Sequence, residues 1–259
     1  MPASFQHDPG HREHDLERRT GSWTPVIRAL GDQDCQVTAG MHHQHLSVGL
    51  FPQLGTGFLR RWHRTFVAVP HGHGVVAVDD RGHVVGFVLV ATCAEEYVEE
   101  VLSSQRWQLG AAGVWALLRR PSVAAAFART RGRRYARRLV RRRPAGPGGH
   151  ATTSTAAVTT RDEESDVPAR TAVVYAMVTA PAVRGRGVGR RMLEDAVEAA
   201  RSAGAGEVCL LTRDTASSTR AGPAAGAGAA GFYDRLGWQR VRQVERDGAV
   251  LTEFRWALS

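Results

Sequence analysis

The stretch Val183-Arg184-Gly185-Arg186-Gly187-Val188-Gly189-Arg190 decides the fold class of this 259-residue chain. It joins a β-branched segment at 172–178, which predicts a strand, to a segment at 187–202 with apolar residues every three or four positions, which predicts an amphipathic helix. Another strand is predicted at 207–212. Strand, loop, helix and strand in this order imply a parallel pair of strands, so we predict a mixed α/β fold.

This loop has the composition of an anion-binding site. Its glycines let the backbone approach a ligand closely, because no Cβ intervenes. The helix that follows has N–H groups without intrahelical partners and the positive end of its macrodipole at the same place. Arg184, Arg186 and Arg190 add positive charge. We therefore predict a pyrophosphate site, in which a side chain at Gly187 or Gly189 would collide with the ligand while the fold stays intact.

Three kinds of phosphate-binding loop are compared with this one. A Walker loop requires a Gly-Lys pair, and the chain contains no lysine, which excludes it. A dinucleotide fingerprint requires G-x-G-x-x-G, whereas the spacing here is G-x-G-x-G and the strand lies far from the N-terminus. The third kind is the Arg/Gln-x-x-Gly-x-Gly/Ala loop of the GNAT acyltransferases, which residues 184–189 match in full.

Two further segments resemble the GNAT superfamily. Met177-Val178-Thr179-Ala180-Pro181-Ala182-Val183 is similar to the family's hydrophobic-Val-x-x-Pro approach to the loop. Residues 230–238, AGFYDRLGW, are similar to its Phe-Tyr-x-x-Leu-Gly-Phe signature. Two motifs in the family's order, divided by a strand, are far more specific than a lone glycine loop. The resemblance covers about 172–257, and the strand, helices and hairpin predicted within 24–91 are compatible with it.

The resemblance implies a GNAT fold, with a mixed central sheet flanked by helices, and transfer of an acyl group from acetyl-CoA or another acyl-CoA to an amine. The amine attacks the thioester directly, so neither a covalent enzyme intermediate nor a metal is expected. A tyrosine matching Tyr233 protonates the departing thiolate; a packing role is the alternative for this residue. Family members bind pantetheine along a strand edge and pyrophosphate on the loop, which here assigns coenzyme binding to Met177, Val178, Thr179, Arg184, Gly185, Arg186, Gly187, Val188, Gly189 and Arg190.

Four segments are predicted along the chain. Residues 1–22 are polar and read as a disordered lead, and 23–91 form the N-terminal half of the GNAT domain. Residues 92–170 form a helical, arginine-rich insertion and a flexible linker, expected to cover the acceptor side, and 171–259 form the C-terminal half. Predicted elements before the insertion are a strand at 24–30, helices at 33–45 (with Asp32 as its cap) and 54–66, and hairpin strands at 75–78 and 84–91.

The acceptor side is assigned to His42 and His43, on the helix at 33–45, and to Glu95 and Glu96, after the third strand. A solvated helix surface is the alternative for each of them. Within the insertion, residues 119–143 hold eleven arginines and no acid. That run is a solvated basic helix, a contact for an acidic acceptor or the 3′-phosphate of CoA, or an interfacial helix near anionic lipid.

The composition limits the remaining classes. The net charge is +9, but all 34 basic residues are arginine, and the chain lacks lysine and asparagine, as a GC-rich genome would produce. The charge is therefore a weak argument for nucleic acid, and none is expected as a partner. No apolar run is long enough to span a membrane, and the three cysteines are scattered, so we expect a cytoplasmic protein. A homodimer is one option for its assembly.

We predict an acyl-CoA-dependent N-acyltransferase, most simply an N-acetyltransferase, whose acceptor is a small-molecule amine. Within the same class, the alternative is acylation of a protein N-terminus or side chain. From another class, the alternative is a catalytically silent CoA-binding or nucleic-acid-binding protein. An enzyme needs both the phosphate loop and a proton acceptor near the thioester, whereas a sensor needs only the loop.

Overall fold

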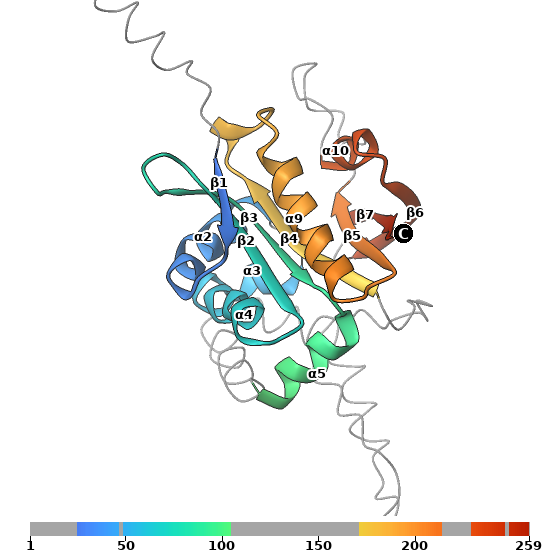
Figure 1. Cartoon of the computed structure of the whole chain (residues 1–259), viewed down its shortest axis with the longest axis horizontal. Coiled ribbons are helices and arrows are strands. Elements are labelled where there is room, and N and C mark those ends of the chain that lie inside the picture. The colour runs from blue at the N-terminus through green and yellow to red at the C-terminus, as the bar shows by residue number, and fades with distance from the viewer. Residues whose placement is uncertain (1–24, 47–48, 105–170, 214–228, 247–248, 259) are drawn as a thin grey trace, which may run out of the picture.

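A computed structural model describes residues 25–46, 49–104, 171–213, 229–246 and 249–258. Within these ranges one seven-stranded sheet, in the order β1-β2-β3-β4-β5-β7-β6, carries helices on both faces (Figure 1). The lead at 1–22, the loop at 214–228, the turn at 247–248 and most of the insertion, including the arginine run at 119–143, lie outside the described residues.

The part of the chain before the insertion builds one side of the sheet. Its strands pair as consecutive antiparallel neighbours, β1 with β2 and β2 with β3. The predicted helix at 54–66 is divided at Gly55, whose φ of 89° ends one helix and begins the next. The elements are β1 (Val26–Ala29), η1 (Asp32–Asp34), α2 (Cys35–His45), α3 (Leu50–Leu54), α4 (Thr56–Ala68), β2 (Gly72–Val78), β3 (Val84–Ala91) and α5 (Ala94–Ser104).

The predicted cap of the first helix is wrong by two residues. Asp32 begins the 3-10 helix η1 and pairs with Arg64 on α4. The carboxylate of Asp34 instead accepts the backbone N–H of Gly31 at 2.9 Å. The guanidinium of Arg28 donates to the same carboxylate at 2.6 and 2.8 Å and holds its pKa below the usual value. Asp34 therefore ties the start of the first helices to β1.

The part after the insertion adds the remaining strands and two helices. The predicted parallel pair is confirmed, since β4 pairs with β5 in parallel and α9 connects them. The other pairs, β3 with β4, β5 with β7 and β6 with β7, are antiparallel. The elements are β4 (Thr171–Thr179), η3 (Pro181–Val183), α9 (Val188–Ser202), β5 (Glu207–Arg213), α10 (Ala229–Arg235), β6 (Gln239–Arg246) and β7 (Ala249–Ala257).

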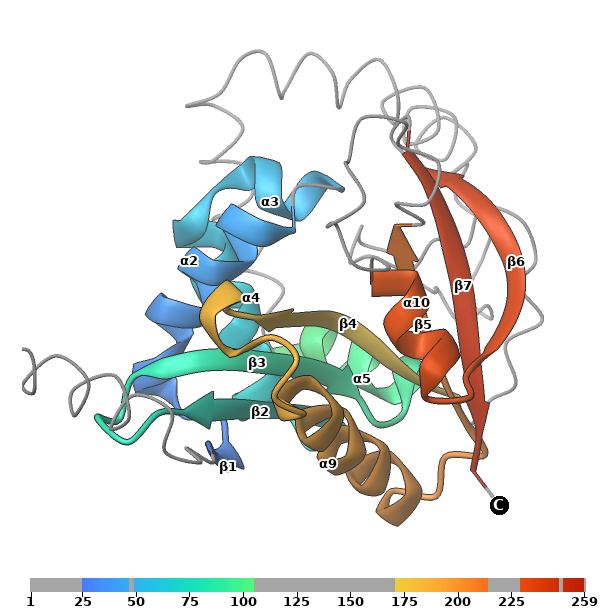
Figure 2. The same ribbon diagram turned by 90° about the horizontal axis from the view of Figure 1, so that it is seen from above.

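The two faces of the sheet carry separate cores, seen edge-on in Figure 2. On one face α4, with α2 beside it, packs Leu59, Trp62 and Phe66 against Phe87 of β3. On the other face α9 packs the apolar stripe that its sequence predicts, which includes Met192 and Ala196, against the sheet, and α10 covers β5 and β7. The fold thus exposes the glycine-rich loop at one end of α9, next to the end of β4.

Candidate active site

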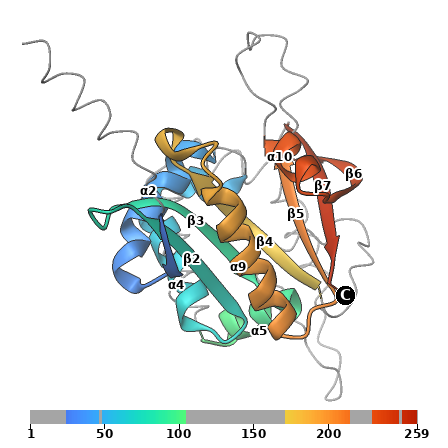
Figure 3. The same cartoon turned by 45° about the horizontal axis from the view of Figure 1, so that its top comes forward.

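The pairing between β4 and β5 stops halfway along β4. The last parallel pair is Val174 with Leu210. On the other edge of β4, Val174 pairs with Val90 and Ala176 with Leu89, so Tyr175 is an extra residue that forms a bulge. A bulge bends its strand and increases the local twist. The two strands consequently diverge from this point toward the end of β4 (Figure 3).

The divergence leaves one edge of β4 without a neighbouring strand. From Tyr175 to Thr179, β4 has a described strand partner only on its β3 side. Backbone N–H and C=O groups at such an edge are available to hydrogen-bond an extended ligand. Met177, Val178 and Thr179, to which the resemblance assigns coenzyme binding, lie on this half of the strand.

The N-terminus of α9 lies beside that free edge. Gly187 is the residue before the helix, has a φ of 74° and provides no side-chain cap. The first turn contains Arg190 and Arg191 and no acid. Arginine at this end is unfavourable with the helix macrodipole, whereas an anion is favourable. Uncapped amides beside arginines suit an anion, which is the ligand type that the sequence predicts here.

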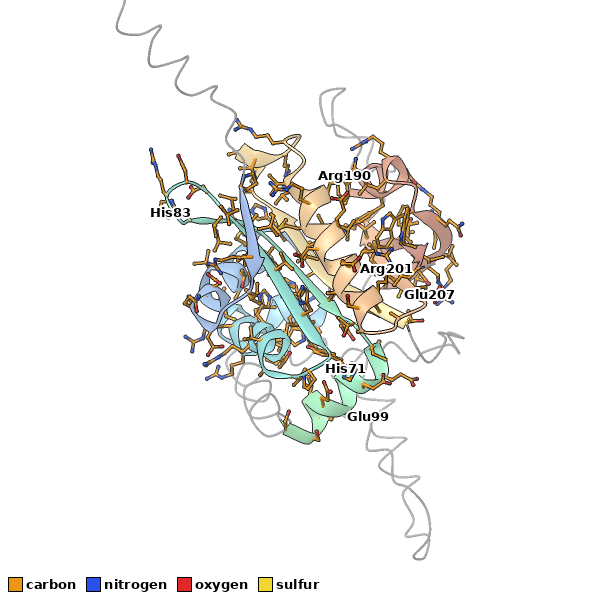
Figure 4. All side chains as sticks on the ribbon, in the orientation of Figure 1. His71, His83, Glu99, Arg190, Arg201 and Glu207 are labelled. Atoms are coloured by element: carbon orange, nitrogen blue, oxygen red, sulfur yellow. The ribbon has the colours of Figure 1, made fainter. Side chains whose placement is uncertain are left out.

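The arginines of the loop are held in different ways. Arg184 donates to the carbonyl of Thr179 at 3.3 Å, and Arg190 donates to Glu194 at 2.7 Å. Arg191 reaches back to the carbonyl of Pro25 at 3.0 Å. Arg186 is exposed and has no hydrogen-bond or ion-pair partner among the described residues. Figure 4 shows Arg190 at this end of α9, and Arg201 at the other.

The glycines of the loop serve different purposes. Gly185 and Gly187 have φ values of 75° and 74°, which favour glycine, and an added Cβ would meet open space. At Gly189 an added Cβ would instead lie 3.0 Å from Cε of Met177 and 3.6 Å from Phe232. The predicted clash between a Gly189 side chain and the ligand stays a prediction, to which the structure adds a second clash within the protein. A Cβ at Gly189 would meet the protein's own side chains, so substitution there also disturbs packing.

Tyr233 joins this group from α10. Its side chain is buried among Phe232, Trp238 and Phe254, with ring centroids 5.1–5.7 Å away. Its hydroxyl donates to the thioether sulfur of Met177 at 3.7 Å, so it is directed at the free half of β4. Burial raises the pKa of the phenol far above its ordinary value, so the hydroxyl stays protonated at neutral pH.

His42 lies on the opposite face of the sheet, in the core. It is 5% exposed, and its ring packs 6.2 Å from that of Phe87. Because the Thr38 hydroxyl donates to the carbonyl of Asp34, it accepts from Nδ1 of His63 at 2.9 Å. Nε2 of His63 must then accept from Nδ1 of His42 at 3.1 Å. This chain fixes the tautomers of both rings and leaves Nε2 of His42 as an acceptor.

Burial keeps these two histidines neutral. It lowers the pKa of His42 to about 4 and holds the pKa of His63 well below its ordinary value. Neither lies on a helix surface, so that alternative for His42 is wrong. His63 was not predicted as part of a site, since no sequence pattern pairs it with His42, which lies on another helix.

The remaining acceptor-side candidates are exposed. His43 bonds the carbonyl of Pro52 through Nδ1 at 3.0 Å. Glu95 and Glu96 begin α5, directly after β3, at the end of the sheet where β4 starts. At about 3.3 Å per residue, the nine residues from Thr171 to Thr179, where β4 leads into the glycine-rich loop, span roughly 26 Å from first to last. The structure therefore brings Tyr233 to the coenzyme-side residues but not these four.

Neither a metal centre nor a membrane span is found in the described residues. They contain no group of three or more His, Cys, Asp or Glu side chains that could hold a metal ion. None of the helices among them has both the length and the apolar character needed to cross a bilayer.

Comparisons with known proteins agree with this geometry. Residues 148–240 match the family model of the acetyltransferase (GNAT) domain. The fold is similar to a GCN5-related N-acetyltransferase from Kribbella flavida, with a TM-score of 0.51 and 17% identity over 90% of this chain and 98% of that one. It is also similar to SsHAT, with a TM-score of 0.50 and 20% identity over 90% and 98%. No curated protein sequence matches the chain.

The chain is thus a mixed α/β protein with the GNAT fold. Residues 148–240, which include the loop at 184–189 and the motif around Tyr233, match the GNAT acetyltransferase domain that these motifs predicted.

Proposed function

We propose that this protein is an acyl-CoA-dependent N-acyltransferase that moves an acetyl or other small acyl group to the amine of a small molecule. One observation carries the proposal. The uncapped, basic N-terminus of α9, the free half of β4 and the buried Tyr233 hydroxyl meet on one face of the sheet. A pyrophosphate, an extended pantetheine arm and a departing thiolate need these three features in this order.

The residues present fit such a donor. The amides at 186–190 and the exposed guanidinium of Arg186 suit the pyrophosphate, and the free edge of β4 suits the amides of the pantetheine arm. When bound, acyl-CoA supplies a thioester carbonyl that an amine attacks directly. The protein's own contribution is to hold the donor in a fixed direction and to exclude water from the hydroxyl of Tyr233.

Tyr233 acts as a general acid in this proposal. Its hydroxyl is protonated at neutral pH because burial disfavours the phenolate. It is directed at the edge of β4 along which the pantetheine arm would lie, so it can donate a proton to the departing sulfur. The C–N bond forms as the thioester C–S bond breaks, and the proton that the amine nitrogen loses balances the one that the sulfur gains. A silent CoA-binding protein would need the loop but no buried donor at this position, which favours the enzyme.

The acceptor is proposed to reach the thioester from the α2 and α4 side, through the gap that opens at the Tyr175 bulge. His42 and His43 lie on that side, and Nε2 of His42 is available to accept a hydrogen bond. Glu95 and Glu96 are nearer to the bulge than to the glycine-rich loop, because β4 begins at their end of the sheet. These four residues remain proposed acceptor contacts.

The test measures thiol release from acetyl-CoA with a panel of small amines and of peptides with free N-termini, and identifies the acylated product by mass spectrometry. Tyr233→Phe is expected to lower kcat about a hundredfold and to leave acetyl-CoA affinity unchanged. Tyr97→Phe is the control, since that tyrosine is also buried and loses a 2.6 Å hydrogen bond to Thr65, but on the other face. Full turnover of the Tyr233→Phe variant would refute the role of Tyr233 as the general acid.

A further inference from the structure

The Tyr233 hydroxyl has an unusual partner. In the described residues it donates only to Sδ of Met177, and a thioether is a weak acceptor. A buried hydroxyl without any partner is destabilising, as for Thr252, whose buried Oγ1 has none among the described residues. The hydrogen bond to Met177 gives the buried Tyr233 hydroxyl a partner and holds it toward β4.

Met177 lies at the junction of three elements of the site. It belongs to the free half of β4, its sulfur faces Tyr233 on α10, and its Cε is 3.0 Å from the position of a Cβ at Gly189 on α9. The side chain is unbranched, so it can turn aside without a backbone change. It therefore occupies the space next to the β4 edge that the sulfur end of the pantetheine arm would approach.

Resting on the proposed function, we infer that Met177 is a positioning residue for Tyr233. Its thioether holds the hydroxyl toward the β4 edge in the free protein, and the coenzyme sulfur takes over the same hydrogen bond when the donor binds. The exchange replaces one weak sulfur acceptor by another, so little free energy separates the two states. A strong acceptor at this position, such as an amide oxygen, would keep its hydrogen bond to the Tyr233 hydroxyl. The proton would then not be available to the coenzyme sulfur.

The same contacts would be seen if Met177 only filled space. A double-mutant cycle distinguishes this packing role from the positioning role. Met177→Leu keeps the volume and removes the sulfur. We expect it to lower kcat three- to tenfold with acetyl-CoA affinity unchanged, and to have no effect on kcat in a Tyr233→Phe background. Met192→Leu is the control, because Met192 is a fully buried methionine in the same core, on α9; its kcat should match the wild type.

Each outcome decides the inference. An equal fold-loss of kcat by Met177→Leu in both backgrounds, or no loss in the wild type, overturns it and leaves the acid role of Tyr233 standing. Full turnover of Tyr233→Phe alone overturns the acid and the positioning role together. If the leucine variant does not fold, Met177→Gln keeps the chain length and adds a strong acceptor. The Met177→Gln variant should lower kcat more than threefold without changing acetyl-CoA affinity, and an unchanged kcat would refute the inference.

Discussion

Alanine at Gly187 and at Gly204 should destabilise the protein equally but affect coenzyme binding differently. Gly187 precedes α9 with a φ of 74°, and Gly204 follows it with a φ of 80°. At both positions an added Cβ has no heavy atom within 4 Å, so no collision contributes. The remaining cost is the left-handed conformation of a non-glycine residue, about 1–2 kcal/mol at each site. The melting temperature should fall about 2–4 °C per kcal/mol in a protein of this size.

The two glycines differ in what surrounds them. Gly187 precedes the uncapped amides of α9, which the proposal assigns to the pyrophosphate. An alanine that leaves the left-handed region there turns those amides away from the ligand. The 15 residues of α9 separate Gly204 from that site, which is about 22 Å at 1.5 Å per residue. We therefore expect Gly187→Ala to raise the Kd for acetyl-CoA at least about tenfold, or 1.4 kcal/mol, and Gly204→Ala to leave it unchanged.

Titration calorimetry with acetyl-CoA and with CoA, alongside thermal unfolding without ligand, measures both quantities. Matched losses of stability with a selective loss of affinity at Gly187 support the site. The same Kd for both variants would refute the reasoning, because it would place the anion elsewhere than at the N-terminus of α9.

The free energy of unfolding should fall by about 3 kcal/mol between pH 6.5 and pH 4 through His42 alone. The cause is that the unfolded state binds a proton at this histidine over that range, whereas the folded state, in which its pKa is about 4, stays largely unprotonated. Urea unfolding at pH 7 and pH 4.5 measures the difference, and the same free energy at both pH values would contradict the prediction. Replacing 106–169 by a short linker should spare acetyl-CoA affinity and abolish acyl transfer in the thiol-release assay. The replacement must begin after α5, whose Tyr97 and Val101 are core residues, and native turnover would exclude an acceptor-side role for the segment. Gly189→Ala should lower kcat as well as affinity, since its Cβ displaces Met177; a purely affinity effect in steady-state kinetics would show that Met177 absorbs the methyl group.

The sequence predicts the parts of the site that local physics controls. The helix at 187–202 is amphipathic along its whole length and follows a strand and a glycine-rich loop, so both the N-terminus of α9 and the parallel pair could be predicted. The position of Tyr233 followed from its motif. Its partner did not, because Met177 is 56 residues away in the chain and nothing in the sequence around either residue selects the other.

The bulge at Tyr175 shows why the opening itself was not predicted. Residues 171–179 read as an uninterrupted apolar strand, and no proline or glycine marks an irregularity. The bulge lies where β4 keeps its pairing with β3 on one edge and loses its pairing with β5 on the other. Register depends on three strands from distant parts of the chain, so a pattern within one of them cannot reveal it. The same reasoning applies to His42 and His63, whose hydrogen bond depends on how two helices pack.

Gly189 connects the two functions that the motifs treat separately. The loop motif assigns it to phosphate binding, and the tyrosine motif assigns proton donation to Tyr233 on another helix. In the structure, the missing side chain at Gly189 makes room for Cε of Met177, and the sulfur of Met177 is the acceptor for Tyr233. A larger residue at 189 would therefore reach the acid through Met177 even with the helix N-terminus intact. Under the proposed function, coenzyme binding and proton transfer are therefore coupled through one packing contact between β4 and α9.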